Sequence, residues 1–277
     1  MKAIVLGASG MLGREAVFAL RRAGWSVTDF SRSAFDLAHP ITLPSTDIIV
    51  NCAAYTNVEQ AEREPEIAAR VNGHAVGDLG LQARRLGAYL IHISTDFVFN
   101  GRVTRPHRED DVPDPLNAYG KSKLLGERLF QESGAMGCIA RVQWSYGAGG
   151  NHFVEKIAQL ARERTHIRVV TDQHGTPSWT RVLASALPIL AKERPDGVVH
   201  LAPNGSASRY AVAQRVVERL GLPTTIEPCV SADFPGVPRP AASTFCTDRA
   251  RGLGIDLGAW EAALDAYLQE HQNRGDE

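Results

Sequence analysis

The sequence predicts an α/β protein with a doubly wound parallel sheet and a smaller C-terminal α/β lobe. Two observations favour this fold. Short runs rich in Val, Ile and Leu alternate with helical stretches through the first half of the 277 residues, and such runs are typical of parallel strands buried on both faces. The first run also leads directly into a segment with three glycines at residues 7–13, where a strand is expected to turn into a helix.

The first three strands are expected near the amino terminus. The run KAIVLG at residues 2–7 is followed by the helical stretch GREAVFALRRAG; WSVTDF at 25–30 supplies a second strand, and TDIIVNCAA at 46–54 a third. Each run is short and apolar and ends at polar residues or glycine, which favours buried strands over helices.

Two more strands follow, each after a helix. Residues 62–87 form the first of these helices and lead into AYLIHIST at 88–95, and residues 122–133 form the second and lead into MGCIARVQW at 136–144. The alternation continues with HIRVVT and GVVHLA, but proline and glycine then become denser. This change indicates a smaller lobe with irregular connections. The charged run HREDD at 107–111 is expected to be a solvated loop.

Composition and charge argue against several classes of protein. The formal net charge is −1, so neither a nucleic-acid partner nor a membrane surface is expected. Glycines interrupt the amino-terminal apolar run and no cleavage-site pattern follows it, which argues against a signal peptide. The four cysteines lack CxxC spacing and the nine histidines lack HxxxH or HExxH spacing, so no metal site is expected. Free thiols favour a reducing cytoplasm.

The glycine segment predicts a Rossmann-type site for a dinucleotide. Glycines let the backbone approach a pyrophosphate closely, and the helix that follows offers unpaired N–H groups at its start. The spacing GxxGxxG is one residue longer in its first step than the usual fingerprint. The candidate cofactor contacts in this segment are Gly7, Gly10, Met11, Leu12 and Gly13.

The end of the second strand bears on the choice between NADPH and NADH. A carboxylate there would hold the adenosine ribose of NAD, whereas an arginine would favour the additional phosphate of NADP. Ser31 and Arg32 stand at the expected strand end and favour NADPH, with NADH as the alternative. Asp36 and Leu37 follow and complete this set of candidate contacts.

The segment YGKSK at 119–123 places a tyrosine and a lysine four residues apart, on one face of the expected helix. A cation near a phenol lowers the pKa of the phenol, which makes it a better proton donor near neutral pH. We therefore expect Lys123 to lower the pKa of Tyr119. A solvated helix face would show the same spacing, so the surrounding motifs decide between the two interpretations.

These motifs together resemble a known family. GxxGxxG with YxxxK more than 100 residues downstream is similar to the extended branch of the short-chain dehydrogenase/reductases, which acts on nucleotide sugars. STDFVFNG at 94–101, PLNAYGKSKLLGE at 115–127 and RVQWSYGAGGNHFV at 141–154 resemble segments of the dTDP-4-dehydrorhamnose reductases. Phe97 and Gln143 depart from that pattern, in which a tyrosine and a serine are usual.

The resemblance implies the reaction and the residues that carry it. It implies an NAD(P)-dependent oxidoreductase that reduces the 4-keto group of a deoxy nucleotide sugar, with dTDP-4-dehydro-β-L-rhamnose as the expected substrate and dTDP-L-rhamnose as the product. Tyr119 would donate the proton, and Thr95 would position the carbonyl. Lys123 would lower the pKa of the Tyr119 phenol and contact the nicotinamide ribose. Further implied contacts are Ala53, Ala54 and Tyr55 with the cofactor, and Thr95, Asp96, Phe97, Tyr119, Trp144 and Arg239 with the substrate.

Three of these side chains have a second interpretation. Asp96 could bind a sugar hydroxyl or cap a turn. Trp144, expected at the end of the fifth strand, could form an apolar wall against the sugar or pack in the core. Arg239 could face the nucleotide diphosphate or form an ion pair between the lobes.

The expected organisation assigns residues 1–146 and about 172–203 to an NAD(P)-binding domain, and 147–171 and 204–277 to a substrate-binding lobe. The resemblance also implies a homodimer. Two alternatives stay open. One is a nucleotide-sugar epimerase or 4,6-dehydratase of the same superfamily, although the pair Asp96-Phe97 lacks the glutamate that dehydratases carry there. The other is a non-catalytic regulatory subunit that resembles the beta subunit of methionine adenosyltransferase.

Overall fold

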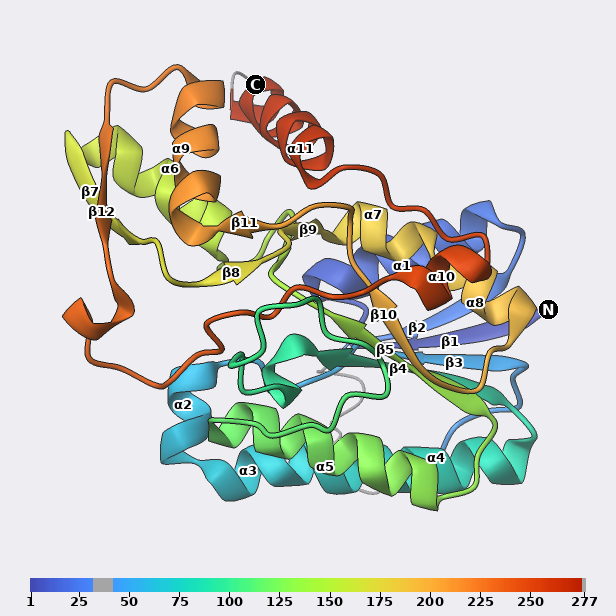
Figure 1. The fold of residues 1–277 in the computed structure, drawn as a ribbon. Helices are drawn as coiled ribbons and strands as arrows, with labels where there is room; N and C mark the ends of the chain where they lie inside the picture. Colours follow the sequence, from blue (N-terminus) through green and yellow to red (C-terminus); the bar gives the residue numbers. More distant parts are fainter. Residues whose placement is uncertain (32–41, 276–277) are drawn as a thin grey trace.

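The computed structural model describes residues 1–31 and 42–275. Its centre is a six-stranded parallel sheet in the order β10-β5-β4-β3-β1-β2 (Figure 1). These strands are β1 (Lys2–Leu6), β2 (Ser26–Phe30), β3 (Ile48–Asn51), β4 (Tyr89–Thr95), β5 (Gly137–Val142) and β10 (Gly197–Leu201). The chain runs from β1 to β2 on one side and then returns past β1 to β3 on the other. The predicted doubly wound parallel sheet is thus confirmed, with its topological switch point between β1 and β3.

Helices cover both faces of this sheet (Figure 1). One face packs against α1 (Met11–Arg22), α7 (Thr180–Ser185), α8 (Leu187–Glu193) and α10 (Asp248–Gly252), and the other against α4 (Ala75–Leu86) and α5 (Ala118–Glu132). Alternate strand residues divide between the two layers: Val5 and Val50 pack with the first group, and Ile4 and Ile49 with the second. Burial on both faces explains why the strands are continuous apolar runs.

The helix expected over residues 62–87 is interrupted. α2 (Val58–Arg63) ends just before α3 (Pro65–Ala69), and a π-helical turn (Arg70–His74) joins α3 to α4. Proline is tolerated only in the first turn of a helix because it lacks an N–H group, so Pro65 opens a new helix. Gly73 lets the π-helical turn lie directly on α5, since an added Cβ would come within 2.6 Å of the Leu125 side chain.

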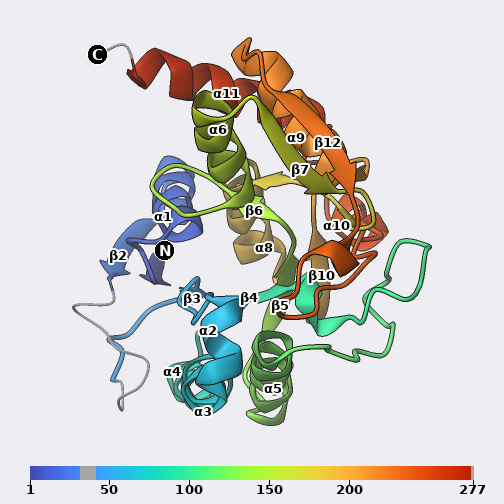
Figure 2. The ribbon, with the colours of Figure 1, turned by 90° about the vertical axis from the view of Figure 1, so that its left-hand side faces the viewer.

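The later part of the chain builds a second hydrophobic core above the sheet (Figures 1 and 2). Its main elements are α6 (Phe153–Glu163), β7 (His166–Val170), α9 (Arg209–Leu220), β12 (Thr225–Cys229) and α11 (Trp260–Gly275). Short strand pairs join it to the sheet, β6 (Ser145–Tyr146) with β9 (Ser178–Trp179) and β8 (His174–Gly175) with β11 (Ala207–Ser208). Two 3₁₀ turns, Asp96–Val98 and Ser231–Asp233, complete the described elements.

The expected division into two domains stays a prediction. Strand β10 lies within residues 172–203 and pairs with β5. Ala250 and Ile255, from the segment 204–277, pack in the hydrophobic core between the sheet and helices α1, α7 and α8 rather than in the second core.

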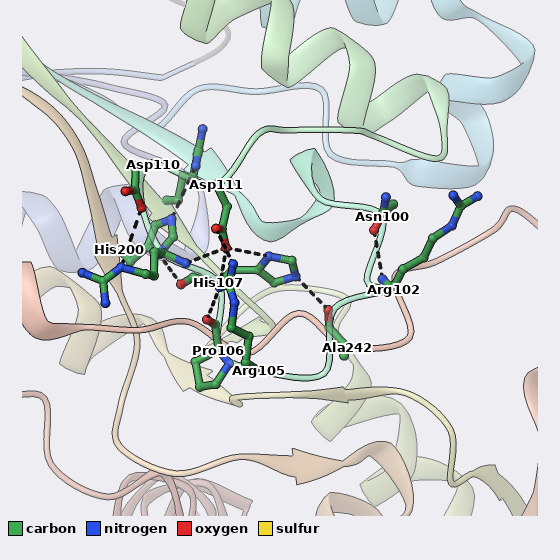
Figure 3. Close-up of polar contacts among 11 residues, drawn as sticks. Asn100, Arg102, Arg105, Pro106, His107, Asp110, Asp111, His200 and Ala242 are labelled. Atoms are coloured by element: carbon green, nitrogen blue, oxygen red, sulfur yellow. Dashed lines mark hydrogen bonds and ion pairs between the residues drawn. The ribbon is translucent and has the colours of Figure 1, made fainter.

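The segment that follows β4 is folded against the chain near residue 242 (Figure 3). The Arg105 guanidinium donates to both carboxylate oxygens of Asp111 at 2.8 and 2.7 Å, and His107 Nε2 lies 3.2 Å from the Ala242 carbonyl oxygen. The His107 side chain is only 3% exposed and stacks on Phe99. The interpretation of residues 107–111 as a solvated loop is therefore wrong for His107, because contacts with a distant segment bury a ring that stands in a charged run.

Candidate active site

A cavity of about 610 Å³ opens at the carboxyl ends of β1, β3, β4 and β5, where open parallel sheets bind their ligands. The predicted site residues that line it are Gly7, Gly10, Met11, Leu12, Gly13, Ala53, Ala54, Tyr55, Thr95, Asp96, Phe97, Tyr119, Lys123, Trp144 and Arg239. Ser31 is not among the lining residues. The other three candidates at the end of β2, Arg32, Asp36 and Leu37, lie outside the described residues.

The described residues contain neither a metal-binding cluster nor a membrane-spanning helix. No group of three or more His, Cys, Asp or Glu side chains within residues 1–31 and 42–275 is placed to hold a metal ion. Across the same residues, no helix has both the length and the hydrophobicity that a membrane crossing would need.

The glycine segment forms a backbone cradle between β1, α1 and β3. Gly7 has a φ of +74°, and a Cβ there would lie 2.7 Å from the backbone nitrogen of Ala53. A Cβ on Gly13 would lie 2.1 Å from the Gly7 carbonyl oxygen. Gly10 precedes α1 without a side-chain cap, so the first N–H groups of α1 are available to an anion. These residues therefore fit the pyrophosphate of a dinucleotide.

We expect Gly13→Ala to weaken dinucleotide binding. The added methyl group would force α1 away from the Gly7 backbone, which cannot yield as a flexible side chain would, at a cost of about 1–3 kcal/mol. Titration calorimetry with NADP⁺ should show about a 5- to 150-fold loss of affinity, since each 1.4 kcal/mol is about tenfold. Gly236→Ala is the matched control, because nothing lies within 4 Å of that Cβ position. Equal NADP⁺ affinities for the two variants would contradict this account of the cradle.

Thr95 and Tyr119 meet at one wall of the cavity. Thr95 ends β4, and its hydroxyl accepts a hydrogen bond from the Phe97 backbone N–H at 3.2 Å and donates to Asp96 Oδ1 at 3.1 Å. The Asn117 side chain caps the start of α5 by accepting from the Gly120 N–H at 2.8 Å. This cap starts the helix one residue before Tyr119, so the phenol projects from its first turn beside Thr95.

The pKa of Tyr119 moves in the direction opposite to the prediction. Desolvation in the cavity wall raises the pKa of the Tyr119 phenol to about 12, the Thr95 hydroxyl opposes this change, and the Asp96 charge adds to it. The expected lowering of this pKa by Lys123 is therefore not found. The phenol stays protonated at neutral pH, which is the form that a proton donor needs.

The Lys123 ammonium contacts residues of β4 rather than Tyr119. Its side chain is 2% exposed, and Nζ donates to the Ile93 carbonyl oxygen at 2.7 Å and lies 3.4 Å from His92 Nε2. Burial lowers the pKa of Lys123 to about 8, against the opposing charge of Glu127. Burial and then the Lys123 charge hold the pKa of His92 well below its usual value, so the imidazole is neutral. Because Asn51 Oδ1 accepts from the Ala53 N–H, the Asn51 NH₂ group faces His92 Nδ1, which accepts from it.

An ion pair lies one turn further along α5. Arg141 Nε and Nη2 donate to the two oxygens of Glu127 at 2.9 and 2.6 Å, and both side chains are 3% exposed. The Ser94 hydroxyl also donates to Glu127. The pair therefore locks α5 to β4 and β5 beneath Lys123.

Asp96 is a buried carboxyl that lines the cavity. It is 2% exposed, its Oδ2 accepts no hydrogen bond from the part of the chain that the structure describes, and Thr95 rather than Asp96 caps the 3₁₀ turn after β4. Burial raises the pKa of Asp96 to about 6, although the nearby hydroxyls of Ser243 and Thr95 and the charge of Arg209 oppose this change. The carboxyl is thus available to a ligand hydroxyl.

The raised pKa of Asp96 makes stability depend on pH. The folded protein holds this proton up to about pH 6, whereas the unfolded chain loses it near pH 3.8, so the carboxylate destabilises the fold as the pH rises through this window. We expect Asp96→Asn to match wild-type stability near pH 4 and to exceed it by about 3 kcal/mol at pH 7, taking about 1.4 kcal/mol per pKa unit.

Urea unfolding at the two pH values measures this difference, with Asp78→Asn on the exposed surface of α4 as the matched control. An Asp96→Asn protein whose stability follows the wild-type pH profile would disprove the burial argument.

Trp144 and two arginines also line the cavity. Strand β5 ends at Val142 rather than at Trp144, and Trp144 adopts a left-handed backbone with a φ of 42°, which is rare for a bulky residue. The Arg209 guanidinium lies 3.7 Å from the Trp144 ring centroid. Arg239 forms an ion pair with Glu59 at 2.9 Å, the alternative foreseen for it, while its side chain still lines the cavity.

Arg209 has no counterpart among the predicted site residues. Burial lowers the pKa of Arg209 to about 10, the Asp96 charge opposes this, and the Arg239 charge adds to it, so the three charged groups share one electrostatic environment. An arginine at the start of a helix carries no sequence signal for a binding site. Only the packing of α9 in the second hydrophobic core brings it into the cavity.

Comparisons with known proteins agree with this geometry. The chain matches the family model described as RmlD substrate binding domain over residues 1–273. The chain belongs to this family. The dTDP-4-dehydrorhamnose reductase of Streptomyces griseus is 39% identical over 277 residues, which cover 94% of this chain and 91% of the relative. The spore coat polysaccharide biosynthesis protein SpsK of Bacillus subtilis is 39% identical over 282 residues, 99% of each chain.

Solved structures of the family share the fold. A dTDP-4-dehydrorhamnose reductase from Clostridium acetobutylicum superposes with a TM-score of 0.93 at 30% identity, over 98% of this chain and 100% of the other. That of Bacillus anthracis, solved in complex with NADP, gives 0.92 at 30% identity, over 97% and 99%. The resemblance inferred from the sequence motifs is thus confirmed.

Proposed function

We propose that this protein reduces the 4-keto group of a deoxy nucleotide sugar with NADPH, and that it converts dTDP-4-dehydro-β-L-rhamnose to dTDP-L-rhamnose. The observation that carries the proposal is that a single cavity joins the glycine cradle to the hydroxyls of Thr95 and Tyr119. Relatives named dTDP-4-dehydrorhamnose reductase support the substrate. The Bacillus anthracis structure in complex with NADP supports NADPH as the cofactor, with NADH as the alternative.

The chain's own residues would position the carbonyl and deliver a proton. When bound, NADPH would supply the hydride. Tyr119 would donate a hydrogen bond to the carbonyl oxygen, and Thr95 would do the same by turning its hydroxyl hydrogen away from Asp96 Oδ1. Tyr119 would pass its proton to the carbonyl oxygen as negative charge develops there. Lys123, anchored on the Ile93 carbonyl oxygen, would keep a positive charge beneath the site and contact the nicotinamide ribose.

A turnover assay tests the proposal. Purified protein is mixed with NADPH and dTDP-4-dehydrorhamnose, and the loss of NADPH absorbance is followed together with the formation of dTDP-rhamnose by NMR. We expect one NADPH to be consumed per product formed. If no keto-sugar nucleotide is turned over, the proposal fails and the regulatory-subunit alternative gains support.

The dehydratase alternative has less support. Phe97 stands where that reaction would need a carboxylate base, and its ring packs edge-on against Tyr119 with 5.4 Å between centroids. The keto-sugar assay also separates the two reactions, because a dehydratase would consume no NADPH. A homodimer and a cytoplasmic location stay predictions, and light scattering after size-exclusion chromatography would measure the oligomeric state.

A further inference from the structure

Buried polar atoms without partners gather at the cavity. Most of those found within residues 1–31 and 42–275 belong to side chains that line it: Asp96 Oδ2, Gln143 Nε2, Tyr146 Oη and Thr180 Oγ1. An unpaired buried polar group is costly, so native proteins rarely keep one without a use. For Gln143, one hydrogen bond to the backbone fixes which end of the side-chain amide is left without a partner.

The orientation of the Gln143 amide follows from Thr176. The Thr176 backbone N–H donates to Gln143 Oε1 at 2.8 Å. A backbone N–H can only donate, so the oxygen of the amide must face Thr176 and the NH₂ group must point elsewhere. The side chain is 1% exposed, so this NH₂ group is a donor hidden from bulk water, and no atom of the described residues accepts from it.

Gln143 lies next to the proposed reaction centre. Strands β4 and β5 pair with Thr95 opposite Val142, which places Gln143 one residue beyond the partner of Thr95. Both residues line the cavity, as does Phe97, the other position that departs from the family pattern. The Phe97 side chain has no hydrogen-bonding group. Of the two side chains that depart from the family pattern, only Gln143 can therefore donate a hydrogen bond.

We propose that the Gln143 amide donates a hydrogen bond to an acceptor oxygen of the ligand bound beside Thr95 and Tyr119, and that it thereby determines which ligand the cavity accepts. The inference rests on the proposed function and names a specificity-determining residue for it. The acceptor is an uncharged oxygen, from a hydroxyl or ring oxygen of the sugar or from the carboxamide of the nicotinamide. These two sources belong to separate molecules and can be titrated separately.

Two variants distinguish the donor role of the Gln143 NH₂ group from the acceptor role of its oxygen. Gln143→Met loses both the donor and the acceptor for the Thr176 N–H. Gln143→Glu keeps an oxygen for Thr176 but presents a second oxygen to the cavity, which repels an acceptor while it is ionised and can donate once it is protonated. Gln173→Met, at a half-buried glutamine that donates to Ser231 and does not line the cavity, is the matched control.

Calorimetry with NADP⁺ and with dTDP-L-rhamnose, each over a range of pH, gives the result. We expect both Gln143 variants to bind one of the two ligands about 10- to 100-fold more weakly at neutral pH, and the Gln143→Glu protein to recover that affinity as the pH falls. Weakened dTDP-L-rhamnose binding assigns the acceptor to the sugar, and weakened NADP⁺ binding assigns it to the nicotinamide.

Two outcomes would overturn the proposal. If Gln143→Glu binds as the wild type does at neutral pH while Gln143→Met does not, the side chain serves only to accept from Thr176. If both variants bind both ligands as the wild type does, Gln143 contacts neither. A wild-type protein that binds dTDP-L-rhamnose without turning over any keto sugar would defeat the proposed function but would leave this binding test intact.

Discussion

Tyr119→Phe is expected to lower kcat for keto-sugar reduction by about 10²–10⁴-fold, the usual contribution of a positioned proton donor. The substitution removes a single hydroxyl and keeps the ring that packs edge-on against Phe97. Binding of NADP⁺ should change by no more than about twofold, because the cradle that fits the pyrophosphate is made of backbone. The loss should therefore fall on the chemical step.

Single-turnover kinetics with saturating NADPH measures that step directly. Tyr210→Phe is the matched control, since the Tyr210 hydroxyl accepts from Gln214 and the residue does not line the cavity. A Tyr119→Phe enzyme that keeps kcat within about threefold of wild type would mean that another group supplies the proton, because a positioned donor is worth far more than that.

Arg141→Met is expected to produce the largest loss of stability, about 3–5 kcal/mol. The substitution leaves the Glu127 carboxylate buried with the Ser94 hydroxyl but without its bidentate cation. An unpaired buried charge costs far more than the pair itself contributes, because water can no longer solvate it. Urea unfolding at neutral pH measures the loss.

Two further variants test the cause. Arg141→Met combined with Glu127→Met should recover most of the lost stability, since an apolar pair of similar volume is often as stable as a buried ion pair. Arg21→Met breaks an exposed pair with Asp29, whose side chains are 55% and 47% exposed, and should cost less than about 1 kcal/mol. A double variant no more stable than Arg141→Met would show that packing, rather than the stranded charge, causes the loss.

Much of the fold and part of the candidate site could be predicted because they depend on neighbours in sequence. A run such as AYLIHIST is a strand because most of its residues are apolar or β-branched, which suits burial on both faces of a sheet. Gly7 and Gly13 stand where they do because β1 must turn into α1 beside the backbone of residue 53. Once the parallel sheet is predicted, Thr95 and the glycine segment must both lie at its carboxyl edge.

Other features could not be predicted, because segments far apart in sequence produce them. His107 stands in a charged run but is buried by Phe99 and Ala242. Arg209 enters the cavity only because α9 packs above it.

The amino-acid sequence determined the order of strands and helices, the glycine turn and the spacing that puts Tyr119 and Lys123 in one helix, because each of these follows from local periodicity and backbone sterics. Tertiary structure alone decided the protonation of these groups. Desolvation raises the pKa of Tyr119, with the Asp96 charge adding to the change, and desolvation lowers the pKa of Lys123 against the charge of Glu127. Burial depends on which atoms surround a group in space rather than on its position in the chain.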